Sequence, residues 1–276
     1  MRAFLPLVAV VALIPATVPA DPLRPSIRQQ IDLGQAAAKE VQKEYKVLPE
    51  SDPRVREVRR LGAQIVAQIP ERERKDRPFV YSFDVIESKD LNAFALPGGP
   101  IYIYTGLLDQ LKTEDAVIGI LAHEVVHIRN QHWASAYADN TKRRLGIALI
   151  LGAVNAGDVA FDVAGLADDL AFTLPYSRRH ETEADRVGYD MMVAAGYNPA
   201  GLINVMEILK AASKGRGGPE WLSTHPDTDR RINALKDRLN KDRRRFPAQR
   251  DRNPNVLPKA TEPPKPGGSG GSVSRR

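Results

Sequence analysis

The chain has 276 residues, 42% of them hydrophobic, and a net charge of +6, which is the profile of a globular protein with a substantial core in one large domain or two small ones. It contains no cysteine, so disulfides and thiolate metal ligands are excluded, and histidines and carboxylates are left to bind any metal. The basic clusters have no interleaved aromatic residues, which argues against nucleic-acid binding and leaves weak attraction to an anionic membrane surface open.

Residues 1–20 have the composition of an export signal. An arginine precedes an apolar run from Ala3 to Ile14, and Val18-Pro19-Ala20 offers small residues where a signal peptidase reads the chain. We expect cleavage before Asp21 and a protein of the periplasm or the cell exterior. An uncleaved anchor is the weaker alternative, because the apolar run is short and prolines interrupt it. Lipid attachment through an N-terminal cysteine is excluded.

Two amphipathic helices are predicted next. Apolar residues recur at helical spacing from Ile27 to Tyr45. The start signal Ser51-Asp52-Pro53 opens a second helix, which is expected to reach Ile69. We expect both helices to wrap the core.

From Phe79 the pattern changes to extended segments. Phe79–Ile86 alternates aromatic and β-branched residues, Leu91–Leu96 is short, and Ile101–Tyr104 follows the turn sequence Pro97-Gly98-Gly99-Pro100. These segments predict a small sheet directly before the next helix. An edge strand of such a sheet can hold an extended peptide by strand addition, and the alternative is that the sheet is only structural cover.

The next helix carries the sequence His123-Glu124-Val125-Val126-His127. We expect Thr113 to cap its start. Side chains four residues apart project from one face of a helix, so the two imidazoles can bind one tetrahedral metal ion. Glu124 lies one step around the helix, where it can hold a water without occupying a ligand position. The pattern predicts a zinc site with its own general base.

The apolar stretch Leu145–Phe172 is rich in small residues. Its uncharged run is about a dozen residues, well short of the roughly twenty that a spanning helix requires. We expect a buried or lid-like helical hairpin, with membrane insertion as the weaker alternative.

Three more helices are predicted after this stretch: Ser177–Ala195, one that begins at Asn198-Pro199, and one after His225-Pro226-Asp227. Beyond Phe246 the composition shifts to Pro, Gly, Ser, Lys and Arg, which predicts a disordered tail. The expected organisation is therefore a signal at 1–20, a single domain at 21–245 and a tail at 246–276.

A catalytic zinc needs a third protein ligand and an open position. A histidine six residues after the second one is excluded because Trp133 stands there, and His132 is interpreted as a polar residue at the helix end. Glu181 and Asp185 share one face of a later helix, so one can bind the metal while the other holds the distal nitrogen of a ligand histidine. Glu183 points elsewhere and is interpreted as half of a surface pair.

Four motifs in order resemble the metallopeptidases of peptidase family M48, which includes the Ste-type prenyl-protein endopeptidases, a bacterial heat-shock membrane protease and the mitochondrial Oma-type protease. The resemblance covers about 79–239. It implies an α+β, mostly α, zincin-like fold with a small β-sheet before the His-Glu-x-x-His helix. The motifs are Asn92–Gly99, His123–His127, Tyr176-Ser177-Arg178 with Glu181 and Asp185, and Thr224-His225-Pro226 with Arg231.

Carried over position by position, the resemblance implies one Zn²⁺ per chain and a role for each matching residue. The ligands are His123, His127 and Glu181, with Glu124 as base and Asp185 in an orienting role. His225 is a gate or extra ligand and Arg231 contacts the reacting carbonyl; the alternatives are a helix-start residue and a surface ion pair. The substrate-facing strand is implied to contain Asn92, Ala93, Phe94 and Ala95.

These observations predict a compact, exported zinc endopeptidase that cleaves unfolded or misassembled envelope proteins. The alternative is a periplasmic chaperone or assembly factor whose zinc site is structural or latent. The intact Glu124 argues against a structural site, because a closed site has no use for a base, whereas His225 could keep the site latent by filling the fourth position. A zinc-dependent nuclease or esterase lacks supporting residues.

Overall fold

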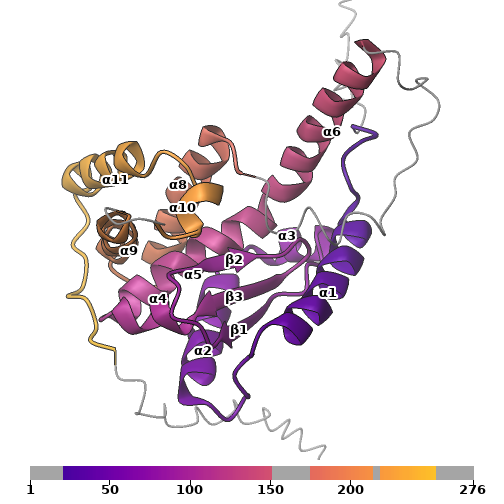
Figure 1. Cartoon of the computed structure of the whole chain (residues 1–276). Helices are drawn as coiled ribbons and strands as arrows, with labels where there is room; N and C mark the ends of the chain where they lie inside the picture. The colour runs from indigo at the N-terminus through magenta and orange to yellow at the C-terminus, as the bar shows by residue number, and fades with distance from the viewer. Residues whose placement is uncertain (1–20, 151–174, 214–217, 253–276) are drawn as a thin grey trace, which may run out of the picture.

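A computed structural model of the chain describes residues 21–150, 175–213 and 218–252 (Figure 1). The predicted signal at 1–20, most of the predicted hairpin at 145–172 and residues 253–276 of the predicted tail lie outside the described residues. The fold is α+β and mostly helical, with one small sheet, as the sequence predicts.

The first two helices begin at strong sequence signals. Helix α1 (Ile27–Glu44) starts with a capping box in which Ser26 and Gln29 each accept a hydrogen bond from the other's backbone N–H. Helix α2 (Pro53–Val66) starts at Asp52, whose side chain accepts from the backbone N–H of Arg54. Both helices lie where they are predicted, although α2 ends three residues before Ile69.

The sheet contains three short strands in the order β1-β3-β2. Strand β1 (Ser82–Ile86) runs parallel to β3 (Pro100–Tyr104), and β2 (Ala93–Ala95) runs antiparallel to β3 with Ala93 opposite Ile103. The turn from β2 to β3 contains Gly99, whose φ is 145° and whose Cβ would lie 1.8 Å from the carbonyl oxygen of Val80. Because β3 lies between the other two strands, β2 is an edge strand among the described residues.

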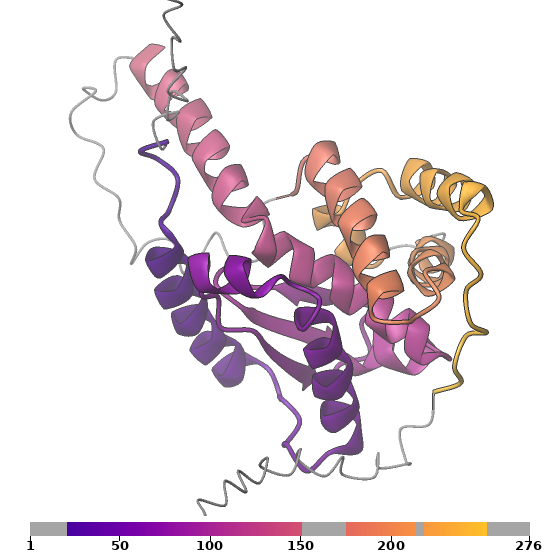
Figure 2. The same ribbon diagram turned by 180° about the vertical axis from the view of Figure 1, so that it is seen from behind.

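The two faces of the sheet pack against different helices. On one face, Tyr102 and Tyr104 of β3 join a buried cluster with Ala37 and Val41 of α1. On the other face, Ile101 and Ile103 of β3 belong to the main core, together with apolar residues of α2 and of the helix at Glu114–Arg129. The views in Figures 1 and 2 agree that α1 lies on one side of the sheet and α2 on the other.

Helix α5 (Glu114–Arg129) is the centre of the molecule. It starts at Thr113, whose hydroxyl accepts from the backbone N–H of Ala116, and every residue from Asp115 to Ile128 is buried. The short helix α4 (Thr105–Gln110) separates it from β3, so the sheet does not lead directly into α5 as predicted. Helix α6 (His132–Ile150) follows α5 and projects from the body in both views.

Within the described ranges, four helices cover the side of α5 that faces away from the sheet (Figure 1). Helices α8 and α9 pack on α5, and α11 packs on both of them. Gly201 permits the close approach of α9, because a Cβ there would lie 2.1 Å from the carbonyl oxygen of Asp115. The four helices are α8 (Arg178–Ala194), α9 (Ala200–Ala212), α10 (Trp221–Thr224) and α11 (Thr228–Lys241).

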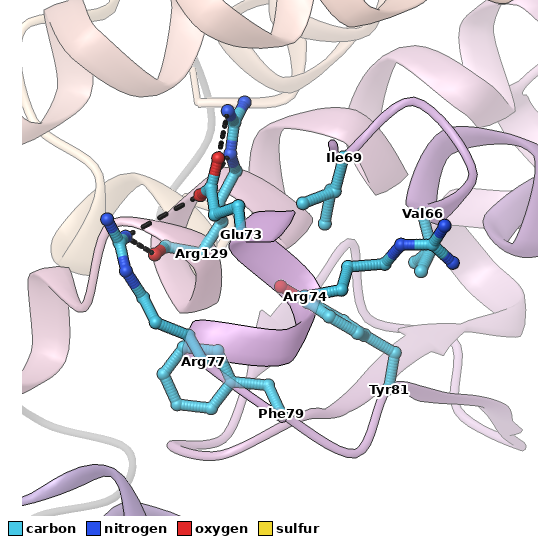
Figure 3. Close-up of a pocket in the computed structure, with 8 residues that line it drawn as sticks. All are labelled: Val66, Ile69, Glu73, Arg74, Arg77, Phe79, Tyr81 and Arg129. Atoms are coloured by element: carbon cyan, nitrogen blue, oxygen red, sulfur yellow. Dashed lines mark hydrogen bonds and ion pairs between the residues drawn. The ribbon is translucent and has the colours of Figure 1, made fainter. Parts of the chain in front are cut away.

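A cavity of about 260 Å³ lies beside the C-terminal end of α5, next to helix α3 (Glu71–Asp76) (Figure 3). No residue of α3 is buried, and an ion pair holds the helix in place. Arg129 makes hydrogen bonds of 2.8 and 2.7 Å to the carboxylate of Glu73, and Arg77 donates to the backbone carbonyl of Arg129. Apolar side chains of Val66, Ile69, Phe79 and Tyr81 form much of the rest of the cavity wall.

Residues 246–252 correct the prediction that disorder begins at 246. The backbone N–H of Arg250 donates to the buried carboxylate of Asp115 over 2.7 Å, and Asp251 forms a β-bridge with Thr113. Arg252 makes hydrogen bonds of 2.8 and 2.9 Å to the carboxylate of buried Glu57. Composition alone missed this packing because the partners lie far away in the sequence.

Among the residues that the structure describes, no helix combines the length and apolarity needed to cross a membrane.

Candidate metal centre

The predicted ligands are brought together by two neighbouring helices. His123 and His127 lie one turn apart on α5, and Glu181 lies in the first turn of α8. Ser177 fixes the start of α8 by accepting a hydrogen bond from the backbone N–H of His180. All three predicted ligands are buried. Because α5 and α8 pack along each other, their side chains meet in the interior instead of on the surface.

Three donor atoms point toward a common position. The Nε2 atoms of His123 and His127 are 3.0 Å apart. The carboxylate of Glu181 places Oε2 3.5 Å from His123 Nε2 and Oε1 3.4 Å from His127 Nε2. Buried imidazole and carboxylate donors this close together are the arrangement that binds a divalent metal ion.

His225, at the end of α10, supplies a fourth donor. Its Nδ1 atom lies 3.3 Å from His123 Nε2 and 3.2 Å from both carboxylate oxygens of Glu181. The candidate donor atoms of all four side chains lie within 4.8 Å of one another. The predicted neighbour of the metal position is therefore close enough to act as a ligand.

The spacing of the donors fits a tetrahedral ion. Metal–ligand bonds of about 2.0–2.1 Å require donor atoms about 3.4 Å apart in a tetrahedral site. Five of the six pairs among His123, His127, Glu181 and His225 measure 3.0–3.5 Å when both carboxylate oxygens of Glu181 are used, and all four donors lie within 4.8 Å of one another. Three nitrogens and one carboxylate oxygen, with no sulfur in the set, form a ligand set for a borderline metal.

Asp185 and Arg231 support the ligands from behind. Asp185 Oδ1 lies 3.0 Å from His123 Nδ1, so it can hold the ring nitrogen that faces away from the metal position. Arg231 makes hydrogen bonds of 2.7 and 2.8 Å to Asp185 and also forms an ion pair with Glu181. This buried placement suits a residue that fixes the ligands, and the predicted contact of Arg231 with a substrate carbonyl stays a prediction.

The electrostatics keep two of the three predicted ligands, His127 and Glu181, in the forms that bind metal. Burial lowers the pKa of His127 well below its usual value, so its imidazole is neutral. Burial opposes ionisation of Glu181, but His225 and Arg231 hold its pKa well below the usual range and keep it a carboxylate. Burial also opposes a charge on His123, but the hydrogen bonds with Asp185 and Glu181 raise its pKa to about 9. Metal binding at His123 therefore displaces a proton.

The structure differs from the sequence interpretation at His132 and Glu183, and it adds Tyr176, to which no role was assigned. His132 is buried, and its Nδ1 lies 3.1 Å from Nδ1 of His127, so it is no mere polar residue at a helix end. Glu183, interpreted as half of a surface pair, accepts from Asn130 and lies 3.5 Å from His132 Nε2. The ring of Tyr176 stacks on His127 at 3.9 Å. Tyr176 belongs to a quoted motif, whereas no sequence signal marks the contact of His132 with His127.

Glu124, the predicted base, is also buried beside the cluster. Its Oε1 accepts a hydrogen bond of 3.2 Å from the indole N–H of Trp221 and lies 3.7 Å from His225 Nε2. Its Oε2 is buried without a hydrogen-bond partner. An orphaned carboxylate oxygen next to a metal position suits a group that receives a proton from water. Trp221 also stacks on His225 at 4.3 Å and was not predicted as part of the site.

The predicted substrate strand lies next to the centre. Ala93, Phe94 and Ala95 form β2, which packs on α5, and Asn92 donates a hydrogen bond of 3.1 Å to Glu220 just before α10. A narrow cavity is lined by Ala95 and Leu96 at the end of β2 and by His127 and Tyr176 at the metal position. The edge strand and the ligands therefore share one hollow.

Comparison with known proteins agrees with this site. The chain is 31% identical over 210 residues to the mitochondrial metalloendopeptidase OMA1 of Schizosaccharomyces pombe. This alignment covers 75% of this chain and 60% of that protein. It is 29% identical over 170 residues to metalloprotease LoiP of Escherichia coli (58% and 64% covered), and 27% identical over 168 residues to the beta-barrel assembly-enhancing protease of Escherichia coli (58% and 34% covered).

The chain thus spans from about a third to just under two thirds of the length of these relatives. The model of peptidase family M48 matches residues 54–239, which contain α2 except its first residue, the sheet and every residue of the metal centre. The match covers more than half of the chain. On this match and on the arrangement of its buried donors, the chain belongs to peptidase family M48.

Proposed function

We propose that the protein is a zinc-dependent endopeptidase. The single observation that carries the proposal is the buried set of His123, His127 and Glu181 at tetrahedral spacing, with the orphaned carboxylate oxygen of Glu124 beside it. Zinc is the metal of choice for neutral imidazoles and one carboxylate in a catalytic site. A purely structural site would have no use for a buried carboxylate oxygen without a hydrogen-bond partner.

In this proposal, bound zinc would polarise the scissile carbonyl and make water acidic enough to attack it. Glu124 accepts the proton of the attacking water on Oε2 and then delivers it to the leaving amine. Trp221 holds the carboxylate of Glu124 through its indole N–H, which fixes Oε2 in place. Asp185 holds the ring of His123 through Nδ1, and Arg231 in turn fixes Asp185.

We propose misfolded or misassembled envelope proteins as substrates, and a place in the periplasm or outside the cell. An unfolded stretch would add to the open edge of β2 by backbone hydrogen bonds, which select extended chains of any sequence. The name of the beta-barrel assembly-enhancing protease supports an envelope substrate, and the export signal predicted at 1–20 agrees with that location.

A second candidate function, a latent or regulated form, is favoured by one observation. His225 Nδ1 lies 3.2–3.3 Å from His123 Nε2 and from the carboxylate oxygens of Glu181, close enough to fill a fourth ligand position. A protein ligand there excludes water from that position. We propose that this arrangement is the resting state and that His225 must move before cleavage. A chaperone or assembly factor with a permanently closed site is the extreme case of this form.

Casein degradation tests the proposed function most directly. The wild-type protein should degrade casein, and a chelator should abolish the activity until zinc is restored. Glu124→Gln should retain one zinc per chain and lose at least about a hundredfold in rate, because it cannot accept the proton of water. Glu71→Gln on exposed α3 is the matched control and should cleave like the wild type.

Normal turnover by Glu124→Gln would refute the assigned base. Absence of cleavage by the wild type and by a His225→Ala variant alike, with zinc bound in both, would contradict the peptidase proposal and favour the chaperone. Cleavage that appears only in His225→Ala would support the latent form.

A further inference from the structure

A second cavity, of about 220 Å³, lies between α8 and α11 and is lined in part by Asp185 and Arg231, which also contact His123 and Glu181. Five arginines and two aspartates line it, so the lining carries a net formal charge of +3. The aspartates are Asp185 and Asp227, and the arginines are Arg178, Arg186, Arg230, Arg231 and Arg238. A concave site with this excess of positive charge attracts anions.

Three of these arginines have unused hydrogen-bond donors. Arg231 binds Asp185, and Arg238 binds Asp190 and the backbone carbonyl of Arg186. By contrast, no hydrogen bond joins the guanidinium group of Arg178, Arg186 or Arg230 to any residue that the structure describes. Guanidinium forks match the oxygens of phosphate and carboxylate groups, and the charge of +3 favours the more highly charged phosphate.

Asp227 is the group with which a bound anion would compete for Arg178 and Arg230. Its Oδ2 lies 3.6 Å from both Arg178 and Arg230, too far for a hydrogen bond, and both arginine side chains are more than two thirds exposed. Such pairs are weak. Asp227 also makes no capping hydrogen bond to α11. Its carboxylate is therefore poorly held.

We propose that this cavity binds a phosphate group through Arg178, Arg186 and Arg230, and that the bound group displaces Asp227 and so moves His225 from the metal position. The second half rests on the latent form proposed above. Asp227 is two residues after His225 and only Pro226 lies between them, so a displacement of Asp227 pulls on the backbone next to His225. An added anion repels the Asp227 carboxylate and takes away both of its arginine partners.

Direct binding tests the first half without any proteolysis. Inorganic phosphate is titrated calorimetrically into the purified protein at constant ionic strength, with and without chelator to separate this site from the metal. We expect saturable binding that persists in chelator. Arg178→Gln with Arg230→Gln should weaken it at least about tenfold, because two charge-assisted contacts are lost. Lys241→Gln, on α11 outside the cavity, should leave the affinity within about twofold.

Equal weak binding by the wild type and both variants would overturn the site, because it would reflect only the basic surface. Circular dichroism shows whether the double variant is folded, and the exposure of both side chains makes a folding defect unexpected. Since cleavage of casein plays no part in this measurement, a failure of the endopeptidase proposal leaves its result intact.

Trp221 reports the second half. It stacks on His225 at 4.3 Å with the ring planes 13° apart, so departure of His225 should change its fluorescence. A Trp133→Phe background leaves Trp221 as the one tryptophan of the chain. Phosphate should change this emission with the same midpoint as the calorimetric binding, and in the double arginine variant the midpoint should rise by the same factor as the calorimetric dissociation constant. Saturable phosphate binding without an emission change would refute the coupling.

The phosphate group has two sources, and vesicles separate them. Vesicles of phosphatidylcholine with and without phosphatidylglycerol are sedimented with the wild type and the double variant. Wild-type binding that requires phosphatidylglycerol and is lost in the double variant supports the site with a lipid headgroup as ligand. Phosphate binding without such vesicle binding supports the site with a free phosphate as ligand.

Discussion

His132 contacts a metal-ligand candidate although it lies outside the His-Glu-x-x-His pattern. A His127 ring that binds a metal through Nε2 carries its proton on Nδ1, and His132 Nδ1 is 3.1 Å away as the acceptor. Burial lowers the pKa of His132 to about 3, so the ring is neutral and able to accept. Behind it, the His180 ring stacks at 4.6 Å.

We predict that His132→Ala weakens zinc binding about 10- to 100-fold, because the His127 ring loses its partner. His132→Asn should restore most of the affinity, since its amide oxygen can accept the same hydrogen bond. Competition with a chromophoric chelator measures both affinities. If the alanine and asparagine variants bind zinc equally well, the hydrogen bond is not what positions His127.

The sequence predicted those site residues that lie one helical turn apart on the same helix, because their spacing is visible in the sequence. His123, Glu124 and His127 share α5, and Glu181 and Asp185 share α8. It could not predict His132, because the contact with His127 depends on how α6 leaves α5. Gln131, with a φ of 56°, turns the chain between the two helices and brings His132 back over His127. A single left-handed residue has no reliable sequence signal.

Helices α5 and α9 approach each other closely through glycine. A Cβ at Gly201 would lie 2.1 Å from the carbonyl oxygen of Asp115, so Gly201→Ala must push α9 away from the metal helix. We predict a loss of at least about 1–3 kcal/mol in the free energy of unfolding, measured by urea denaturation.

Gly188→Ala on α8 is the matched control for this contact. Its Cβ would meet its nearest neighbours at 3.5 Å, which is ordinary packing distance, and alanine favours a helix over glycine. We expect the free energy of unfolding to stay constant or rise by up to about 1 kcal/mol. A similar loss in both variants would contradict the assignment of the effect to the α5–α9 contact.

Most elements were predicted because their signals are local. Four helices begin within one residue of the predicted start, and in each of them a side chain caps the first turn. The capping residues are Ser26, Asp52, Thr113 and Ser177. The pairing of the strands was not predicted, because β1 pairs with β3 although β2 lies between them in the sequence. Such pairing is decided by which apolar faces α1 and α2 cover, and this is a property of the assembled core.

At the scale of the whole molecule, residues 246–252 tie the C-terminal segment to α2 and α5. A chain that ends at residue 245 would leave Glu57 buried without Arg252 and remove the Arg250 N–H from Asp115. We predict that its free energy of unfolding is about 3 kcal/mol below that of a chain ending at residue 252, because one partner of a buried ion pair is missing. Urea denaturation near neutral pH measures the difference.

The difference should shrink as the pH falls. Burial raises the pKa of Glu57 and Arg252 lowers it, so loss of Arg252 raises that pKa further. A carboxyl whose pKa is higher in the folded state than in the unfolded state destabilises the folded state at pH values above the folded-state pKa. This penalty disappears as the pH falls, because the carboxyl is then protonated in both states. A deficit that stays constant from neutral pH down to about pH 4 would show that the buried charge of Glu57 is not its cause.

All five histidines of the chain lie in one connected cluster around the metal position, joined by ring contacts from His180 through His132 and His127 to His123 and His225. Imidazole resonances of the protein in a nitrogen-15 NMR experiment therefore come from this one region, with no background from the surface. Tautomers, protonation and metal coordination can be followed ring by ring in the wild-type chain without any engineered label.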